Sequence, residues 1–308
     1  MKEKFLTEWS RCGAFLTVFL LVFVVTACQS IEHTPVLSSP SPIVTVKATP
    51  NYLETRTPTS IAVATMSTKI PVEPSVTILP IQDGFYWSTG FETGDLSELQ
   101  LNDFGDFVRQ GNGTWGLVSS PAHSGNYAVA LTIDTSQYSP TGAHAAYLFF
   151  WKELPEEAYY YSAWYYIPSN VRPIGFWNLW QWKSTEDGNS DNSQRIFSVG
   201  AQTQGSGLGL YMVQRLPNGE NFNHYQTRSI PLDQWFHLEG YYRQAFDPTG
   251  QVIIWQDGDE VFNIDKAQTV LSDLSVDWSV NNYSDLITPN PCTIYIDDIA
   301  ISKKRVVN

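Results

Sequence analysis

Short aromatic and β-branched segments, separated by tight-turn residues, fill the chain from about residue 82 to its end. The turn signals are Asp187-Gly188, Asn218-Gly219, Asp257-Gly258 and residues 247–250. Segments of Val, Ile, Tyr and Trp at this spacing predict an antiparallel β-sandwich or barrel. No segment shows a long helical stripe of apolar residues. We therefore expect residues 82–308 to form a single all-β domain.

Side-chain alternation sorts the predicted strands into faces, since successive residues of a strand point to opposite sides. The clearest strands are residues 159–168, 176–183, 195–201, 208–214, 235–244, 251–255 and 293–302. In residues 235–244, Phe236 and Tyr242 fall on an apolar face, whereas His237, Tyr241 and Arg243 fall on the other. The second face is expected to be open to solvent.

The first residues carry a targeting signal. Lys2, Lys4 and Arg11 precede an apolar run that ends in Val25-Thr26-Ala27-Cys28. This order is typical of a secretory signal peptide, and its end resembles the bacterial lipobox, which implies a lipid on Cys28 after removal of residues 1–27. The alternative is a transmembrane anchor, but the run is shorter than the roughly 20 residues that a span prefers. We expect an extracytoplasmic protein that is attached to the bacterial envelope by lipid alone.

Residues 28–81 are rich in Pro, Ser, Thr and Val, and they predict an extended stalk, because such a tract cannot bury enough surface to fold. The whole chain has a formal charge of -13, which argues against nucleic acid as a partner, since that partner requires many phosphate-neutralising cations. Once Cys12 leaves and Cys28 is lipidated, Cys292 has no disulfide partner. Its apolar surroundings predict a buried structural thiol.

Five segments of the β domain, at residues 90–96, 124–128, 235–242, 250–258 and 295–301, resemble concanavalin A-like jelly-roll domains. Their order is similar to that of heparin-lyase-like polysaccharide lyases and of laminin-G-like carbohydrate-binding domains. The resemblance implies a jelly-roll β-sandwich that engages polysaccharide without an organic cofactor. We expect it to act as a monomer.

A lyase of uronate chains needs three kinds of group. The carboxylate of the sugar must be neutralised, a base must remove the C5 proton, and an acid must protonate the leaving oxygen. Basic residues concentrate between Lys183 and Arg243, and lyases of this fold commonly place Gln and His two apart where this chain has Gln181 and Lys183. The candidate bases are Lys183 and His224, the candidate acids are Tyr225 and Tyr241, and the candidate neutralising residues are Gln181 and Arg243.

Further substrate contacts are predicted from residue type. His237 and Arg195 extend the polar set, and Trp180 and Trp182 share one face of their strand. The two indoles belong either to the core or to a platform on which sugar rings stack. The sequence leaves both open.

The two ends of the domain suggest a metal site by the same resemblance, because jelly-roll carbohydrate modules often join their first and last strands through calcium. Glu92, Asp297 and Asp298 match the expected positions, and calcium takes six to eight oxygen ligands. The alternative is that these carboxylates cap loops or pair with cations.

Three functions fit these features. The leading hypothesis is a polysaccharide lyase acting on a uronate-containing glycan, and it predicts that Gln181, Lys183, Tyr241 and Arg243 converge in one groove. A non-catalytic carbohydrate-binding or adhesion module predicts a shallow aromatic strip instead. A surface domain that binds another protein is the third.

Overall fold

The computed structural model describes residues 84–100, 104–151, 154–185, 194–271 and 276–306. These residues belong to one compact unit, residues 73–308. The predicted stalk, the signal peptide and Cys28 lie outside the described residues. No helix among the described ranges is long and apolar enough to cross a membrane.

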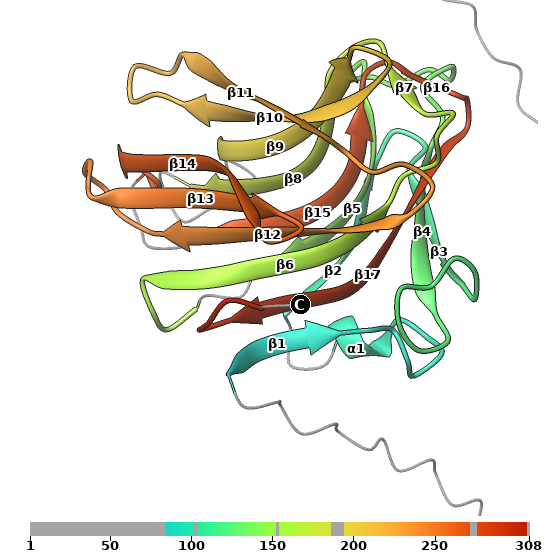
Figure 1. The fold of residues 1–308 in the computed structure, drawn as a ribbon, viewed down its shortest axis with the longest axis horizontal. Coiled ribbons are helices and arrows are strands. Elements are labelled where there is room, and N and C mark those ends of the chain that lie inside the picture. The colour runs from blue at the N-terminus through green and yellow to red at the C-terminus, as the bar shows by residue number, and fades with distance from the viewer. Residues whose placement is uncertain (1–83, 101–103, 152–153, 186–193, 272–275, 307–308) are drawn as a thin grey trace, which may run out of the picture. The chain divides into compact units, whose positions relative to one another are not determined.

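Two antiparallel sheets form the domain and lie as separate layers in Figure 1. The eight-stranded sheet has the order β14-β13-β12-β6-β17-β4-β3, and β1 also pairs with β17. Its strands are β1 (Phe85–Thr89), β3 (Thr114–Val118), β4 (Ala128–Ile133), β6 (Ala158–Tyr166), β12 (Trp235–Arg243), β13 (Gly250–Gln256), β14 (Asp259–Ala267) and β17 (Cys292–Ser302).

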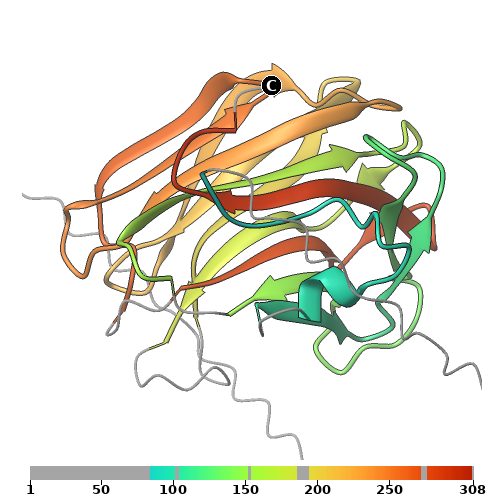
Figure 2. The same cartoon turned by 90° about the horizontal axis from the view of Figure 1, so that it is seen from below.

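The seven-stranded sheet has the order β11-β10-β9-β8-β15-β5-β2. Its strands are β2 (Gly105–Gln110), β5 (His144–Phe150), β8 (Trp177–Ser184), β9 (Gln194–Gln204), β10 (Gly207–Arg215), β11 (Asn221–Ser229) and β15 (Asp277–Ser284). A small pair, β7 (Arg172–Pro173) and β16 (Ile287–Thr288), lies apart, and α1 (Ser97–Gln100) has one turn. The first and last strands lie side by side in Figure 2. The jelly-roll-type β-sandwich expected from the sequence is confirmed.

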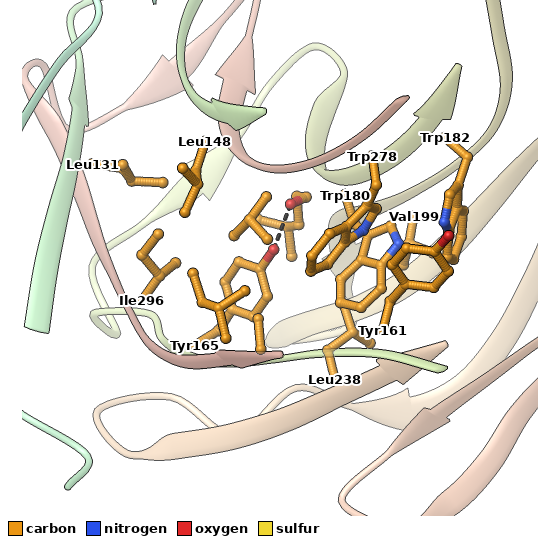
Figure 3. Packing of buried hydrophobic residues seen from close by; sticks show 14 of the residues in the cluster. Leu131, Leu148, Tyr161, Tyr165, Trp180, Trp182, Val199, Leu238, Trp278 and Ile296 are labelled. Carbon is orange, nitrogen blue, oxygen red and sulfur yellow. Dashed lines mark hydrogen bonds between the residues drawn. The ribbon is translucent and has the colours of Figure 1, made fainter. Parts of the chain in front are cut away.

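The core fills the space between the two sheets. Aromatic rings meet there: Trp182 of β8 stacks on Tyr242 of β12, with ring centroids 4.7 Å apart, and Tyr161 packs against Trp278. Figure 3 shows this cluster, in which the Tyr165 hydroxyl donates a hydrogen bond to a main-chain carbonyl 2.5 Å away. Packing of large rings from both sheets fixes how the layers face each other.

Asn282 is a buried polar residue that ties the two sheets together. Its Nδ2 donates to the carbonyls of Leu131, at 2.9 Å, and Cys292, at 3.1 Å. Its Oδ1 accepts a hydrogen bond from Trp177 Nε1 at 3.0 Å. One side chain thus satisfies three buried polar groups, each of which would be costly to leave unpaired.

We expect Asn282→Ala to lower the free energy of unfolding by about 3 kcal/mol, because two carbonyls and one indole N–H would lose their partner. Urea denaturation followed by tryptophan fluorescence measures the change. Asn223→Ala, on the exposed side of an edge strand, is the matched control and should cost less than about 0.5 kcal/mol. Equal losses in the two variants would contradict this account.

All seven strands named from the sequence are present, with ends shifted by at most three residues. The sequence did not indicate β11, because its nine residues are polar except for Phe222, and all of them are exposed or half-buried. An edge strand can form by hydrogen bonding to one neighbour without an apolar face. This strand contains His224 and Tyr225, two of the candidate acid–base residues.

Candidate active site

The seven-stranded sheet turns one side to the core and the other away from it, and we call the second side the open face. Trp180 and Trp182 of β8 point into the core and are fully buried. The alternating residues Gln181 and Lys183 therefore lie on the open face. The two indoles cannot stack on a sugar ring, so the platform alternative is excluded for them.

Lys183 lies at one end of the open face. It pairs in register with Asp277 of β15 on one side and with Arg195 of β9 on the other. Its Nζ is 5.6 Å from the centre of the Phe149 ring. Burial lowers the pKa of Lys183, and the nearby Asp277 carboxylate opposes this shift. The lowered pKa increases the neutral fraction of the amine, the form that can accept a proton.

Arg195 connects Lys183 to a group of tyrosines. Its Nη2 donates to Asn221 Oδ1 at 3.1 Å, and the guanidinium interacts electrostatically with the phenols of Tyr211 and Tyr283. Burial lowers the pKa of Arg195, but an arginine still carries its charge at any physiological pH. The open face therefore holds a half-buried positive charge that interacts with two phenols.

Tyr211 lies across Gly200 on the neighbouring strand. A Cβ at position 200 would stand 2.6 Å from Tyr211 Cζ and 2.4 Å from the Trp177 carbonyl oxygen, so only glycine fits there. Burial raises the pKa of Tyr211, although a hydrogen bond with the Trp177 backbone and the charge of Arg195 act in the opposite direction. The phenol thus keeps its proton at neutral pH and can donate it.

A second tyrosine pair stands next to this group. Tyr147 of β5 and Tyr283 of β15 have ring centroids 5.3 Å apart. Burial, together with the charge and hydrogen bond of Tyr283, raises the pKa of Tyr147. Neither these two residues nor Tyr211 was singled out from the sequence, since a tyrosine in a strand is as readily a core residue.

The remaining acid–base candidates lie elsewhere. His224 and Tyr225 point to opposite faces of β11, because they are consecutive in a strand, and so they cannot act as a pair. Tyr225 is on the open face beside Tyr211 and is 62% exposed. His224 turns toward the other side, where its Nε2 lies 3.0 Å from Gln214 Oε1, and burial lowers its pKa.

His237, Tyr241 and Arg243 lie on the far side of the molecule. Alternation in β12 was predicted correctly, with Phe236 and Tyr242 in the core. The other face was expected to be open to solvent, which is wrong for His237 and Glu239, since both are buried. The strand also belongs to the eight-stranded sheet. Its outer face points away from the open face of the other sheet. The single groove expected to unite Gln181, Lys183, Tyr241 and Arg243 is therefore wrong.

His237 is 2% exposed, its Nε2 has no hydrogen-bond partner among the described residues, and its ring lies 5.0 Å from Trp164. Burial and the neighbouring charges of His123 and Arg305 lower its pKa to about 4. A neutral buried histidine must gain a proton on unfolding below its ordinary pKa, so its contribution to stability is present at neutral pH and falls as the solution becomes acidic.

We expect the free energy of unfolding to lose roughly 2 kcal/mol from His237 alone between about pH 7 and about pH 5. His237→Leu should remove this part of the decline, so that the variant gains on the wild type as pH falls. Urea denaturation at several pH values measures the difference. Parallel curves for the two proteins would show that His237 does not titrate in this range.

Glu92, Asp297 and Asp298 all hold the loop at residues 120–127. Glu92 accepts the backbone N–H groups of Asn126 and Tyr127 at 2.9 and 3.0 Å. Asp297 accepts backbone N–H groups as well, and Asp298 Oδ2 lies 2.6 Å from His123 Nδ1. Donors thus occupy oxygens that a cation would use, and these contacts match the alternative in which the carboxylates hold a loop.

Burial and the charge of Asp298 raise the pKa of Asp297 to about 6. No group of three His, Cys, Asp or Glu side chains that could hold a metal was found within the described residues. Calcium binding stays a prediction, and thermal unfolding with added calcium against a chelator tests it. Cys292 is a buried free thiol, and burial raises its pKa to about 12, which excludes a nucleophilic thiolate at neutral pH.

Comparison with known proteins identifies the family of this chain. A family model described as polysaccharide lyase matches residues 91–300. The chain belongs to the polysaccharide lyase family. No curated protein sequence matches it.

Solved structures of polysaccharide lyases share this fold. The endo-β-1,4-glucuronan lyase of the fungus Trichoderma reesei superimposes with a TM-score of 0.57 and 17% identity, over 71% of this chain and 96% of that one. An alginate lyase from Chlorella virus matches with a TM-score of 0.48 and 11% identity, over 71% of this chain and 100% of that one. An alginate lyase from Aplysia kurodai matches with a TM-score of 0.48 and 12% identity, over 70% of this chain and 98% of that one.

Proposed function

We propose that the domain cleaves a uronate-containing polysaccharide by β-elimination on the open face of the seven-stranded sheet. The observation that carries this proposal is that Arg195, which pairs in register with Lys183, interacts electrostatically with the phenols of Tyr211 and Tyr283. A buried cation beside proton-bearing phenols meets the demands of this reaction, which needs a neutralised carboxylate and a proton donor.

In the proposed mechanism, Arg195 and Gln181 bind the uronate carboxylate and stabilise the negative charge that builds up when the C5 proton leaves. Lys183, in its neutral form, takes that proton. The electron pair forms the C4–C5 double bond, the C4–O bond breaks, and the leaving oxygen takes the proton of Tyr211. The products are two shorter chains, of which one ends in an unsaturated uronate and the other in a newly formed hydroxyl group.

The direct test is to incubate the purified protein with polyglucuronate and alginate while ultraviolet absorbance follows the unsaturated uronate. Polyglucuronate comes first, because the solved lyase with the TM-score of 0.57 is named for glucuronan. We expect turnover on at least one polymer and a loss of about 100-fold or more in Lys183→Ala. Arg243→Ala, on the opposite face of the molecule, should retain activity.

The competing function is a carbohydrate-binding module without catalysis. Retained binding to the same polymers with no rise in absorbance would establish that alternative and reject the lyase. If the protein neither binds nor cleaves these polymers, both proposed functions are rejected for them.

We also propose that lipid on Cys28 holds the protein at the outside of a bacterial envelope, with residues 29–81 as the spacer. The sequence of the leader supports this placement. Labelling of cells with a clickable fatty acid should mark the wild-type protein and should fail in Cys28→Ala, which would then separate from the membrane fraction.

A further inference from the structure

Three large apolar side chains stand exposed where two strands of the open face end. Ile174, Phe176 and Leu286 are 63%, 37% and 43% exposed, and we call them the apolar rim. Residues 174–176 lead into β8 and residue 286 follows β15, its neighbour in the sheet. The backbone N–H of Ile174 donates to the Leu286 carbonyl at 2.9 Å, so the two segments are joined.

The apolar rim is continuous with the candidate active site. The ring of Phe176 packs edge-on against Tyr283, with centroids 4.8 Å apart. The Asp285 carboxylate lies against Gly175, where a Cβ would stand 2.0 Å from its Oδ1. Asp285 also interacts electrostatically with the Tyr211 phenol. A sugar chain with one unit at Arg195 and Tyr211 can therefore place another unit at the apolar rim.

The chemistry of this end of the face differs from that of the centre. The exposed Asp285 carboxylate repels a free uronate carboxylate, and three aliphatic or aromatic side chains offer no partner to a sugar hydroxyl. Contiguous exposed apolar side chains next to a polar site indicate a surface that binds an apolar group of a ligand. The apolar substituents that polysaccharides carry on their hydroxyls include methyl ethers and ester-linked acyl groups, such as acetyl. The methyl of an acetyl group reaches further from the sugar ring than that of an ether.

We propose that the apolar rim binds an O-acyl group on the sugar unit adjacent to the reacting uronate, so that the preferred substrate is an acylated uronate polysaccharide. This inference rests on the proposed function and names its substrate class. Burying one methyl or methylene group changes an equilibrium constant by roughly fourfold, so an acetyl group seated on the rim should improve kcat/KM by about fourfold to tenfold.

The test compares two polymers that differ in one feature: a polyglucuronate carrying O-acetyl groups, and the same polymer after mild alkaline deacetylation. Both kcat/KM and the dissociation constant are measured on each. We expect the wild type to favour the acetylated polymer, and we expect Ile174→Ser and Leu286→Ser to bring the ratio close to one. Phe246→Ser is the matched control, since Phe246 is a 46% exposed apolar residue just after β12 of the other sheet, and it should leave the ratio unchanged.

The outcomes separate the two proposals. Equal kcat/KM on the two polymers, or a preference that Ile174→Ser and Leu286→Ser do not reduce, overturns the role of the apolar rim while leaving the lyase intact. If neither polymer is cleaved but binding still favours the acetylated one in a rim-dependent way, the lyase proposal fails and the rim proposal stands. Failure to bind either polymer overturns both. Because the substituted side chains are exposed, unchanged melting temperatures should accompany each variant.

Discussion

Tyr211→Phe should lower kcat by about 100-fold to 10,000-fold, the range typical for loss of a general acid. The phenol lies next to the Arg195 charge, and burial keeps its pKa above the ordinary value, so it holds a proton at neutral pH. Phenylalanine retains the ring that lies over Gly200 and removes only the hydroxyl. Turnover followed by the absorbance of the unsaturated product measures the effect, and KM should change little.

Tyr225→Phe is the internal comparison for this result. Tyr225 pairs in register with Tyr211 on the same face, but it is largely exposed and lies on the edge strand. It should keep most of the wild-type activity. If Tyr211→Phe stays within about threefold of the wild type, or if Tyr225→Phe loses as much as Tyr211→Phe, the proton donor is not Tyr211.

Arg195→Ala should lower kcat/KM by about 100-fold to 1,000-fold, as is usual when one electrostatic contact to a developing anion is removed. Part of the loss should appear as a higher KM, because in the proposed mechanism the same guanidinium binds the carboxylate before the proton leaves. Arg195→Lys should recover only part of the activity, since an ammonium cannot reproduce the planar two-pronged contact.

Arg243→Ala provides the control for charge as such. It removes the same formal charge from the outer face of the eight-stranded sheet, away from the open face. A general effect of net charge would weaken binding to the polyanion equally in Arg195→Ala and Arg243→Ala. Added salt would reduce such an effect. A loss confined to Arg195 instead supports a specific contact at the reaction centre.

The sequence predicted the β-sandwich and the faces of single strands, but not which strands share a sheet. The alternation of residues 235–244 correctly separates Phe236 from His237, and that of residues 176–183 separates Trp182 from Lys183. Local periodicity contains no information on which sheet a strand joins, because that is decided by pairing between distant segments. Tyr241 and Arg243 were therefore assigned to the same groove as Lys183 and lie on the opposite side of the molecule.

The tyrosines of the site were missed for a different reason. Tyr147, Tyr211 and Tyr283 occur in aromatic-rich strands, where a ring packs in the core as readily as it lines a site. The signal that could have indicated Tyr211 is Gly200 in the middle of a strand, since an interior glycine often marks a close approach of another group. That reading also requires the register of β9 against β10, which only the folded sheet provides.

The proposed reaction centre takes its groups from five adjacent strands: Tyr147 from β5, Lys183 from β8, Arg195 from β9, Tyr211 from β10 and Tyr283 from β15. Consecutive members of this set are separated by between 12 and 72 positions in the sequence. No fragment of the chain can hold a partial centre, because each group depends on sheet neighbours that arrive from other segments. Enzyme activity in such an arrangement requires the whole sheet to be assembled. As denaturant is added, activity should therefore be lost at the same concentrations as the tertiary structure.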